Sequence, residues 1–348
     1  MSKTSKHILV IRLSAMGDVA MSVPVINTFV TEYPEVKITI LTRAFFAPFF
    51  SGIPNVSVFV PDLNKKHKGF LGIWKLSREL LKLNIDAVAD LHDVLRSNIL
   101  VQLLCLKGVP FQQIDKGRAA KKGLVNAINK KFKPLKSSQE RYADVFRNLG
   151  FNLYLKEAVL LPQKELPKVV NDYIGETEKN LIGIAPFAAH KGKMYPLVKM
   201  EEVISEISKD ANTTVLLFGG GKEEKVQLDE ISEQYSNVLN ITGKFSFEEE
   251  LALISNLDVM LSMDSGNGHL AAMFGVQVIT VWGVTHPYAG FVPFKQPKEN
   301  QIVPDLEKFP LIPTSIYGNK YPEGYLGCFD TISPNKIIAE IKKRLKIN

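Results

Sequence analysis

Cysteine is scarce in this sequence, with only Cys105 and Cys328 among 348 residues. Two cysteines so far apart exclude a disulfide framework and a cysteine-rich zinc site, and they favour a reducing, cytosolic compartment. The first residues lack the apolar core of a secretion signal, and no apolar run approaches the roughly 18 residues of a membrane span. Clustered carboxylates and metal-type His/Cys spacings are also missing, so we predict no metal and no bound cofactor.

A glycine-rich dinucleotide motif is missing too. No strand-like run is followed by G-x-G-x-x-G, which argues against a plain dehydrogenase of the Rossmann type. The first apolar run, HILVIRL at 7–13, leads instead into a turn with a single glycine, Gly17, and an acid, Asp18. Asp18 in the first turn of a helix is favoured by the helix dipole alone. The alternative is a carboxylate that accepts the proton of an attacking hydroxyl group.

Strand-like and helix-like segments alternate along both halves of the chain, a pattern that predicts parallel sheets covered by helices. We expect strands at 7–13, 36–42, 56–60, 85–91, 109–115, 181–187, 213–220, 238–243, 257–263 and 276–282. We expect helices at 18–32, 70–83, 94–104, 137–150, 197–209, 222–235, 246–256, 266–274 and 334–346. The predicted organisation is an N-terminal Rossmann-like domain at 1–160, a linker at 161–178, a second Rossmann-like domain at 179–330 and a C-terminal helix at 331–348.

Positive charge is concentrated in one segment. The net charge is +7, and residues 107–136 hold nine Lys and Arg but only one acid, Asp115. The segment is either a solvated loop or a surface for an anionic partner such as membrane headgroups or a phosphorylated glycolipid. Nucleic acid is disfavoured, because only Phe111 and Phe132 could stack on bases there.

Two stretches of the second half predict an anion site. MDSGNGHLAAMFG (263–275) follows a buried strand and opens a helix, so its backbone N–H groups would face the ligand edge of the sheet. PFAAHKGKMYP (186–196) follows a neighbouring strand, and its cations could stabilise a departing diphosphate. The candidate donor-site residues are His190, Lys193, Asp264, Ser265, Gly266, Asn267, Gly268 and His269. The alternatives are a tight turn with Asp264 as helix N-cap, and a solvated basic loop.

Three weaker signals complete the pattern. FGGGKEEKVQ (218–227) lacks the spacing of a phosphate loop. Glu223 or Glu224, early in the following helix, could accept from ribose hydroxyls, and the alternative is an acid favoured there by the helix dipole alone. The family resemblance given below selects Glu224. Ser14 and Gly17 form the turn before Asp18. In DLHDVLRSNIL (90–100), His92 and Arg96 would share one side of a helix if that helix began early, and both could contact an acceptor.

The residues ILVIRLSAMGDVAMSVPVINTF and MDSGNGHLAAMFGVQVITVWGVTHP resemble the lipopolysaccharide heptosyltransferases, glycosyltransferase family 9. The resemblance implies the GT-B fold, with two Rossmann-like domains facing across a cleft. It implies inverting, metal-independent transfer of heptose from ADP-heptose to a lipid A-linked core acceptor. The Ser-x-Met-Gly-Asp turn, which includes Met16, places the general base at Asp18, and a lysine before an aromatic-Pro pair places the phosphate-binding cation at Lys193.

The resemblance also implies partners and a location. These are a nucleotide-sugar donor, an anionic glycolipid acceptor and the cytoplasmic face of the inner membrane. From its charge, we expect the segment 107–136 to hold either the anionic glycolipid or the membrane itself. The sequence departs from the family at Ala188 and Ala189, where hydroxyl residues are common, and at His92, where the family has Asp-x-Gln. Three alternatives therefore stay open: a GT-B enzyme using another nucleotide sugar, a sugar-nucleotide epimerase, and a binding protein without turnover.

Overall fold

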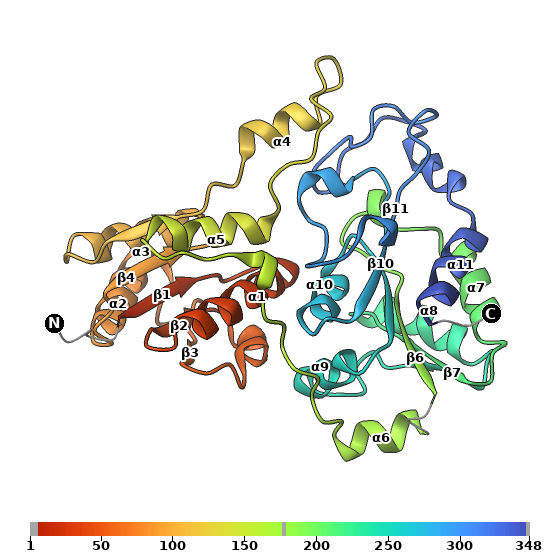
Figure 1. Ribbon diagram of the computed structural model, residues 1–348, viewed down its shortest axis with the longest axis horizontal. Coiled ribbons are helices and arrows are strands. Elements are labelled where there is room, and N and C mark those ends of the chain that lie inside the picture. The colour runs from red at the N-terminus through yellow and green to blue at the C-terminus, as the bar shows by residue number, and fades with distance from the viewer. Residues whose placement is uncertain (1–5, 176–178, 346–348) are drawn as a thin grey trace. The chain divides into compact units, whose positions relative to one another are not determined.

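The computed structural model describes residues 6–175 and 179–345. The chain divides into two compact units (Figure 1), unit 1 with Met1–Lys116 and Ser138–Leu160, and unit 2 with Gly117–Ser137 and Leu161–Asn348. Within the described ranges, no helix is both long enough and apolar enough to cross a bilayer.

Unit 1 is built on a parallel sheet with the strand order β3-β2-β1-β4-β5. Its strands are β1 (His7–Ile11), β2 (Lys37–Leu41), β3 (Val56–Phe59), β4 (Ala87–Asp90) and β5 (Phe111–Gln113). β1 pairs with both β2 and β4, and Ile11 lies opposite Leu41 and Asp90. The carboxyl ends of three neighbouring strands therefore meet at one edge, where open α/β sheets bind ligands.

Four longer helices accompany this sheet. They are α1 (Met16–Glu32), α2 (Gly69–Leu81), α3 (Leu95–Cys105) and α5 (Ser138–Asn148). α2 and α3 bury their apolar sides with Leu9 and Ile11 of β1 in one core cluster, and α1 packs against α5. The helix expected at 18–32 begins at Met16, so Asp18 lies in its first turn.

Unit 2 contains a second parallel sheet with the order β11-β10-β9-β6-β7-β8. Its strands are β6 (Asn180–Ala185), β7 (Thr213–Leu217), β8 (Val238–Asn240), β9 (Val259–Met263), β10 (Gln277–Val281) and β11 (Gln301–Ile302). Its principal helices are α7 (Leu197–Ile207), α8 (Lys222–Ser232), α9 (Phe247–Ser255), α10 (Gly266–Met273) and α11 (Pro334–Leu345). α7, α8 and α11 share one apolar core with β6 and β9, so the C-terminal helix belongs to unit 2.

Residues 117–137 differ from the expectation of a single domain at 1–160. This stretch, which includes α4 (Arg118–Leu124), clusters with unit 2. Lys130 Nζ donates to the carbonyls of Leu124, Leu311 and Pro313 at 3.2, 2.8 and 3.0 Å. The bonds to Leu311 and Pro313 attach this stretch to residues 181 and 183 positions later in the chain, a pairing that no local pattern reveals.

The expected linker at 161–178 is partly helical. α6 (Lys168–Ile174) lies within it, and residues 176–178 fall outside the described part of the chain. Residues 1–5 and 346–348 of the predicted end segments also fall outside it. A capping box begins α9, because the Glu249 carboxylate accepts from the Ser246 N–H at 2.8 Å.

Candidate active site

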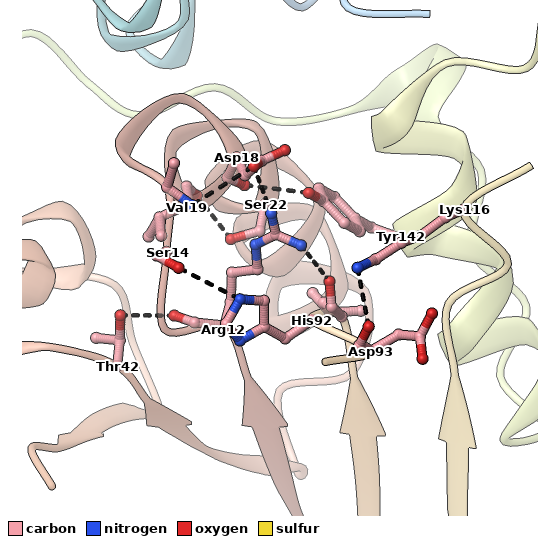
Figure 2. Close-up of polar contacts among 12 residues, drawn as sticks. Arg12, Ser14, Asp18, Val19, Ser22, Thr42, His92, Asp93, Lys116 and Tyr142 are labelled. Atoms are coloured by element: carbon pink, nitrogen blue, oxygen red, sulfur yellow. Dashed lines mark hydrogen bonds and ion pairs between the residues drawn. The ribbon is translucent and has the colours of Figure 1, made fainter. Parts of the chain in front are cut away.

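Asp18 lies beside a buried arginine at the ligand edge of unit 1 (Figure 2). Arg12, directly after β1, has a side chain that is 7% exposed, whereas that of Asp18 is 34% exposed. Arg12 Nη2 lies 2.6 Å from Asp18 Oδ2, and the Ala15 N–H reaches the same oxygen at 3.5 Å. Among the described residues, Asp18 Oδ1 has no hydrogen-bond partner, so this oxygen is available to a ligand.

Arg12 is itself fixed from several sides. Its Nη1 donates to the Leu91 carbonyl at 2.5 Å, and its guanidinium lies over the Tyr142 ring at 5.7 Å. The Tyr142 hydroxyl donates to the Asp18 carbonyl at 3.3 Å, and burial raises the pKa of this phenol. Thr42 donates to the Arg12 carbonyl at 2.7 Å. These contacts hold the cation under the carboxylate and restrict the carboxylate to one orientation.

His92 lies after β4 and faces Ser14. Its Nε2 is 3.3 Å from Ser14 Oγ, and its buried Nδ1 has no hydrogen-bond partner in the described part of the chain. Burial, followed by the charges of Arg12 and Lys116, lowers the pKa of His92 to about 4. The imidazole is therefore neutral near pH 7 and can donate or accept a hydrogen bond.

The buried carboxylate of Asp90 shapes the turn that carries His92. One oxygen accepts the N–H groups of His92 and Asp93 at 2.9 and 3.1 Å, and the other accepts from Gln113 at 2.8 Å. Because α3 begins at Leu95, His92 precedes the helix, and the expected helical spacing of His92 and Arg96 is wrong. Arg96 lies in the first turn of α3, while Met16 and Gly17 open α1.

Unit 2 brings its two predicted anion stretches together through an ion pair. Lys193 Nζ lies 2.8 Å from Asp264 Oδ2 and donates to the Asp264 carbonyl at 3.2 Å. The Thr285 hydroxyl donates to the same carboxylate oxygen at 3.0 Å. An ammonium group has three donors, so one remains for a phosphate oxygen. Asp264 therefore holds the lysine and does not cap α10, whose N-cap is Ser265.

The start of α10 presents further groups. Gly266 and Asn267 occupy its first positions, where backbone N–H groups lack partners within the helix. Ser265 Oγ is buried and has no hydrogen-bond partner among the described side chains and backbone. Packing explains the glycine at position 268, because a Cβ there would lie 2.5 Å from Ser262 Oγ on β9. His269 is buried on the same helix.

The remaining donor-site candidates lie at the same edge with different surroundings. Glu224, in the first turn of α8, turns back and accepts the Gly220 N–H at 2.6 Å through one oxygen. His190 is exposed before the short turn that carries Lys193. A Cβ on Gly192 would lie 2.4 Å from the Gly318 carbonyl. Position 192 therefore requires glycine, because the turn that carries Lys193 packs closely against the backbone at Gly318.

Three residues that complete these clusters were not predicted from the sequence: Arg12, Tyr142 and Thr285. Arg12 carried a usable signal, since a cation directly after an apolar strand is rarely buried without a partner. Tyr142 and Thr285 carried none, because their contacts join segments far apart in the sequence. Within residues 6–175 and 179–345, no group of three His, Cys, Asp or Glu side chains could hold a metal ion.

The two parallel-sheet units have the fold of GT-B glycosyltransferases, as predicted. A family 9 glycosyl transferase of Veillonella parvula superposes with a TM-score of 0.77 at 18% identity, over 99% of each chain. Escherichia coli heptosyltransferase WaaC, solved with ADP, superposes with a TM-score of 0.66 at 19% identity, covering 97% of this chain and 99% of WaaC.

The family follows from the sequence match. The model of glycosyltransferase family 9 (heptosyltransferase) matches residues 73–309, well over half of the chain. The lipopolysaccharide core heptosyltransferase OpsX of Haemophilus influenzae is 25% identical over 294 residues, covering 82% of this chain and 81% of OpsX. The chain belongs to glycosyltransferase family 9, which confirms the predicted resemblance.

Proposed function

We propose that this enzyme transfers heptose from ADP-heptose to a lipopolysaccharide core acceptor with inversion at the anomeric carbon. The observation that carries the proposal is the arrangement of Asp18, with one carboxylate oxygen held by Arg12 and the other available. Family membership and the similarity to OpsX support the donor sugar and the acceptor class. The ADP in the WaaC structure supports the nucleotide.

The reaction begins at Asp18. The acceptor hydroxyl loses its proton to Asp18 Oδ1 as its oxygen forms a bond to the anomeric carbon. The bond between that carbon and the phosphate oxygen breaks, and its electron pair leaves on ADP. Because attack and departure occur on opposite faces of the sugar, the configuration inverts.

Unit 2 receives the negative charge that develops on the leaving group. The third donor of Lys193 and the first N–H groups of α10 are placed to stabilise a diphosphate. Ser265, Asn267 and His190 lie beside them, and Glu224 has one carboxylate oxygen for a ribose hydroxyl. Since these groups supply positive charge and donors, we propose that transfer proceeds without a metal ion.

The acceptor side includes Ser14, His92 and Arg96. We propose that the acceptor is an anionic glycolipid reached at the cytoplasmic face of the inner membrane, and that residues 107–136 contribute positive charge there. Part of this charge is engaged internally, because Lys116 donates to the Asp93 carbonyl and Lys121 lies over the Phe291 ring. Lys107, Lys122, Lys131 and Lys133 are exposed, and we propose that these lysines contact lipid headgroups.

Asp18→Asn tests the proposal. We expect turnover, measured as acceptor-dependent ADP release, to fall by about 10² to 10⁴-fold, while calorimetric affinity for ADP-heptose stays within about twofold. Glu248→Gln, in the first turn of α9, is the matched control and should retain wild-type turnover. Near-full activity of Asp18→Asn would overturn the base assignment.

The same assay separates the alternatives. Conversion of the sugar nucleotide without acceptor, followed by proton NMR, would identify an epimerase instead. Tight ADP-heptose binding with no transfer to any core acceptor would identify a binding protein. Preference for another nucleotide sugar in a melting-temperature screen would redirect the donor assignment.

A further inference from the structure

The outer side of α2 carries three large apolar side chains that the fold leaves uncovered. Phe70, Leu71 and Trp74 are 62%, 72% and 43% exposed. Residues 70 and 74 are one helical turn apart and 71 lies beside them, so the three form one patch. The opposite side of α2 buries Ile73, Leu76 and Leu80 in the core of unit 1. Figure 1 shows α2 next to α3, against which it packs in unit 1.

Cations surround this patch on both sides. The exposed basic residues of the loop and the helix are Lys65, Lys66, Lys68, Lys75, Arg78 and Lys82. Only Asp62 and Glu79 oppose them between residues 62 and 82. Glu79 is paired with Lys66 at 2.7 Å, and Asp62 accepts the backbone N–H groups of Lys65 and Lys66. The surface beside the apolar patch is therefore strongly positive.

This combination matches the chemistry of an anionic bilayer. Tryptophan is enriched at membrane interfaces, and lysine stems lie along apolar surface while their ammonium groups reach phosphate headgroups. The Arg78 guanidinium lies 5.0 Å from the Trp74 ring centroid, so one cation already extends along the patch. A protein partner of matching size would not require cations on both flanks, whereas headgroups surround anything inserted between them.

We propose that α2 is a membrane-docking helix, with Phe70, Leu71 and Trp74 inserted among the headgroups of an anionic bilayer. The inference rests on the proposed function, because a lipid-linked acceptor gives the enzyme reason to work at a bilayer. Within unit 1 this docking surface shares no residue with the Asp18 cluster, and it supplies apolar insertion, which positive charge alone does not.

The chain contains a built-in probe for this surface. Of its two tryptophans, Trp74 is 43% exposed and Trp282 is fully buried. Vesicles of phosphatidylethanolamine with a minority of phosphatidylglycerol, carrying brominated acyl chains, should quench Trp74 and protect it from acrylamide. Phosphatidylcholine vesicles with the same bromination should bind much more weakly. Absence of quenching in the anionic vesicles would overturn the proposal.

Variants that retain Trp74 test the patch directly. Phe70→Ser with Leu71→Ser should weaken partitioning into anionic vesicles at least about tenfold, because two apolar side chains no longer insert. Lys68→Gln with Lys75→Gln should weaken it about fivefold per cation. The control pair is Val198→Ser with Val226→Ser, which removes exposed apolar side chains from α7 and α8 of unit 2. An equal loss in the control, or no loss in the α2 variants, would overturn the assignment.

Activity separates this proposal from the proposed function. With a deacylated, soluble acceptor, the Phe70/Leu71 variant should retain wild-type turnover, whereas with acceptor embedded in vesicles its turnover should fall several-fold. An equal fall on the soluble acceptor would contradict docking as the role of α2. Wild-type protein that binds vesicles but transfers heptose to neither acceptor would overturn the proposed function and leave α2 docking supported.

Discussion

Each unit places one carboxylate and one cation in contact at the carboxyl edge of its sheet, but the two pairs are reversed. In unit 1 the cation is buried and the acid is partly exposed, with the side chain of Arg12 at 7% and that of Asp18 at 34%. In unit 2 the acid is buried and the cation is more open, with Asp264 at 4% and Lys193 at 14%. The more exposed member of each pair is the one available to a ligand, and the buried member positions it.

The reversal matches the two halves of a transfer reaction. A hydroxyl that must lose a proton needs a carboxylate as its neighbour, and a diphosphate that must depart needs a cation. In both units the buried residue, Arg12 or Asp264, orients the more exposed residue of the pair, Asp18 or Lys193, and occupies part of its hydrogen-bonding sites. If this comparison is right, removing the more exposed member should lower turnover more than removing the buried member, and removing either member should also cost stability because its partner charge loses its counter-ion.

Apart from Asp18→Asn, Lys193→Met should cause the largest loss of turnover. Loss of the cation is expected to lower turnover by about 10² to 10³-fold and weaken ADP-heptose binding. It also leaves the buried Asp264 carboxylate without its cation, which should cost about 3–5 kcal/mol in the free energy of unfolding. Denaturant unfolding and acceptor-dependent ADP release measure the two effects.

A double variant separates these roles of Lys193. Lys193→Met with Asp264→Asn removes both charges, so most of the lost stability should return while turnover stays low. Recovery of turnover in the double variant would mean that Lys193 acts only by neutralising Asp264.

Arg12→Met should have the next largest effect. The Asp18 carboxylate then loses the donor that fixes its Oδ2, and we expect turnover to fall between about 10- and 10²-fold. The fall should appear in kcat more than in the KM for ADP-heptose, because the donor-site residues lie in unit 2. Stability should also decrease, since Arg12 donates to the Leu91 carbonyl.

Arg12→Lys is the matched variant for this test. A lysine retains the charge and one or two donors, so it should recover part of the turnover and keep the shape of the pH–rate profile. Equal losses of kcat and stability in the Met and Lys variants would instead indicate a purely structural role for Arg12.

The comparison of the two pairs also shows what sequence can predict. Alternating patterns located most longer strands and helices of both sheets, because buried parallel strands read as apolar runs. Asp18 and Lys193 became candidates because each follows a strand of such a sheet, and the roles proposed for them came from the resemblance to the family motifs. Their partners were partly missed, since Arg12 looked like a strand residue and Asp264 like a helix cap. The contacts of Lys130 with Leu311 and Pro313, which attach the α4 segment to unit 2, join residues 181 and 183 positions apart, and no local signal encodes such a pairing.

Substitution of His92 should have the smallest effect of the variants, and it should change how the free energy of unfolding depends on pH. Because burial lowers its pKa to about 4, the folded protein binds fewer protons than the unfolded chain between pH 4 and 6.5, so acid weakens the fold. His92→Gln removes this contribution and restores the Gln of the family pattern beside Ser14. Between pH 6.5 and 5.5, wild type should lose about 1 kcal/mol more unfolding free energy than the variant, measured by urea titration.

Other titrating groups are common to both proteins and cancel in the difference. They include Glu250, whose pKa is raised to about 7 by burial, and His286, whose pKa is lowered to about 4. Parallel pH dependences of the two proteins would show that His92 is not the buried neutral imidazole that the geometry of unit 1 requires.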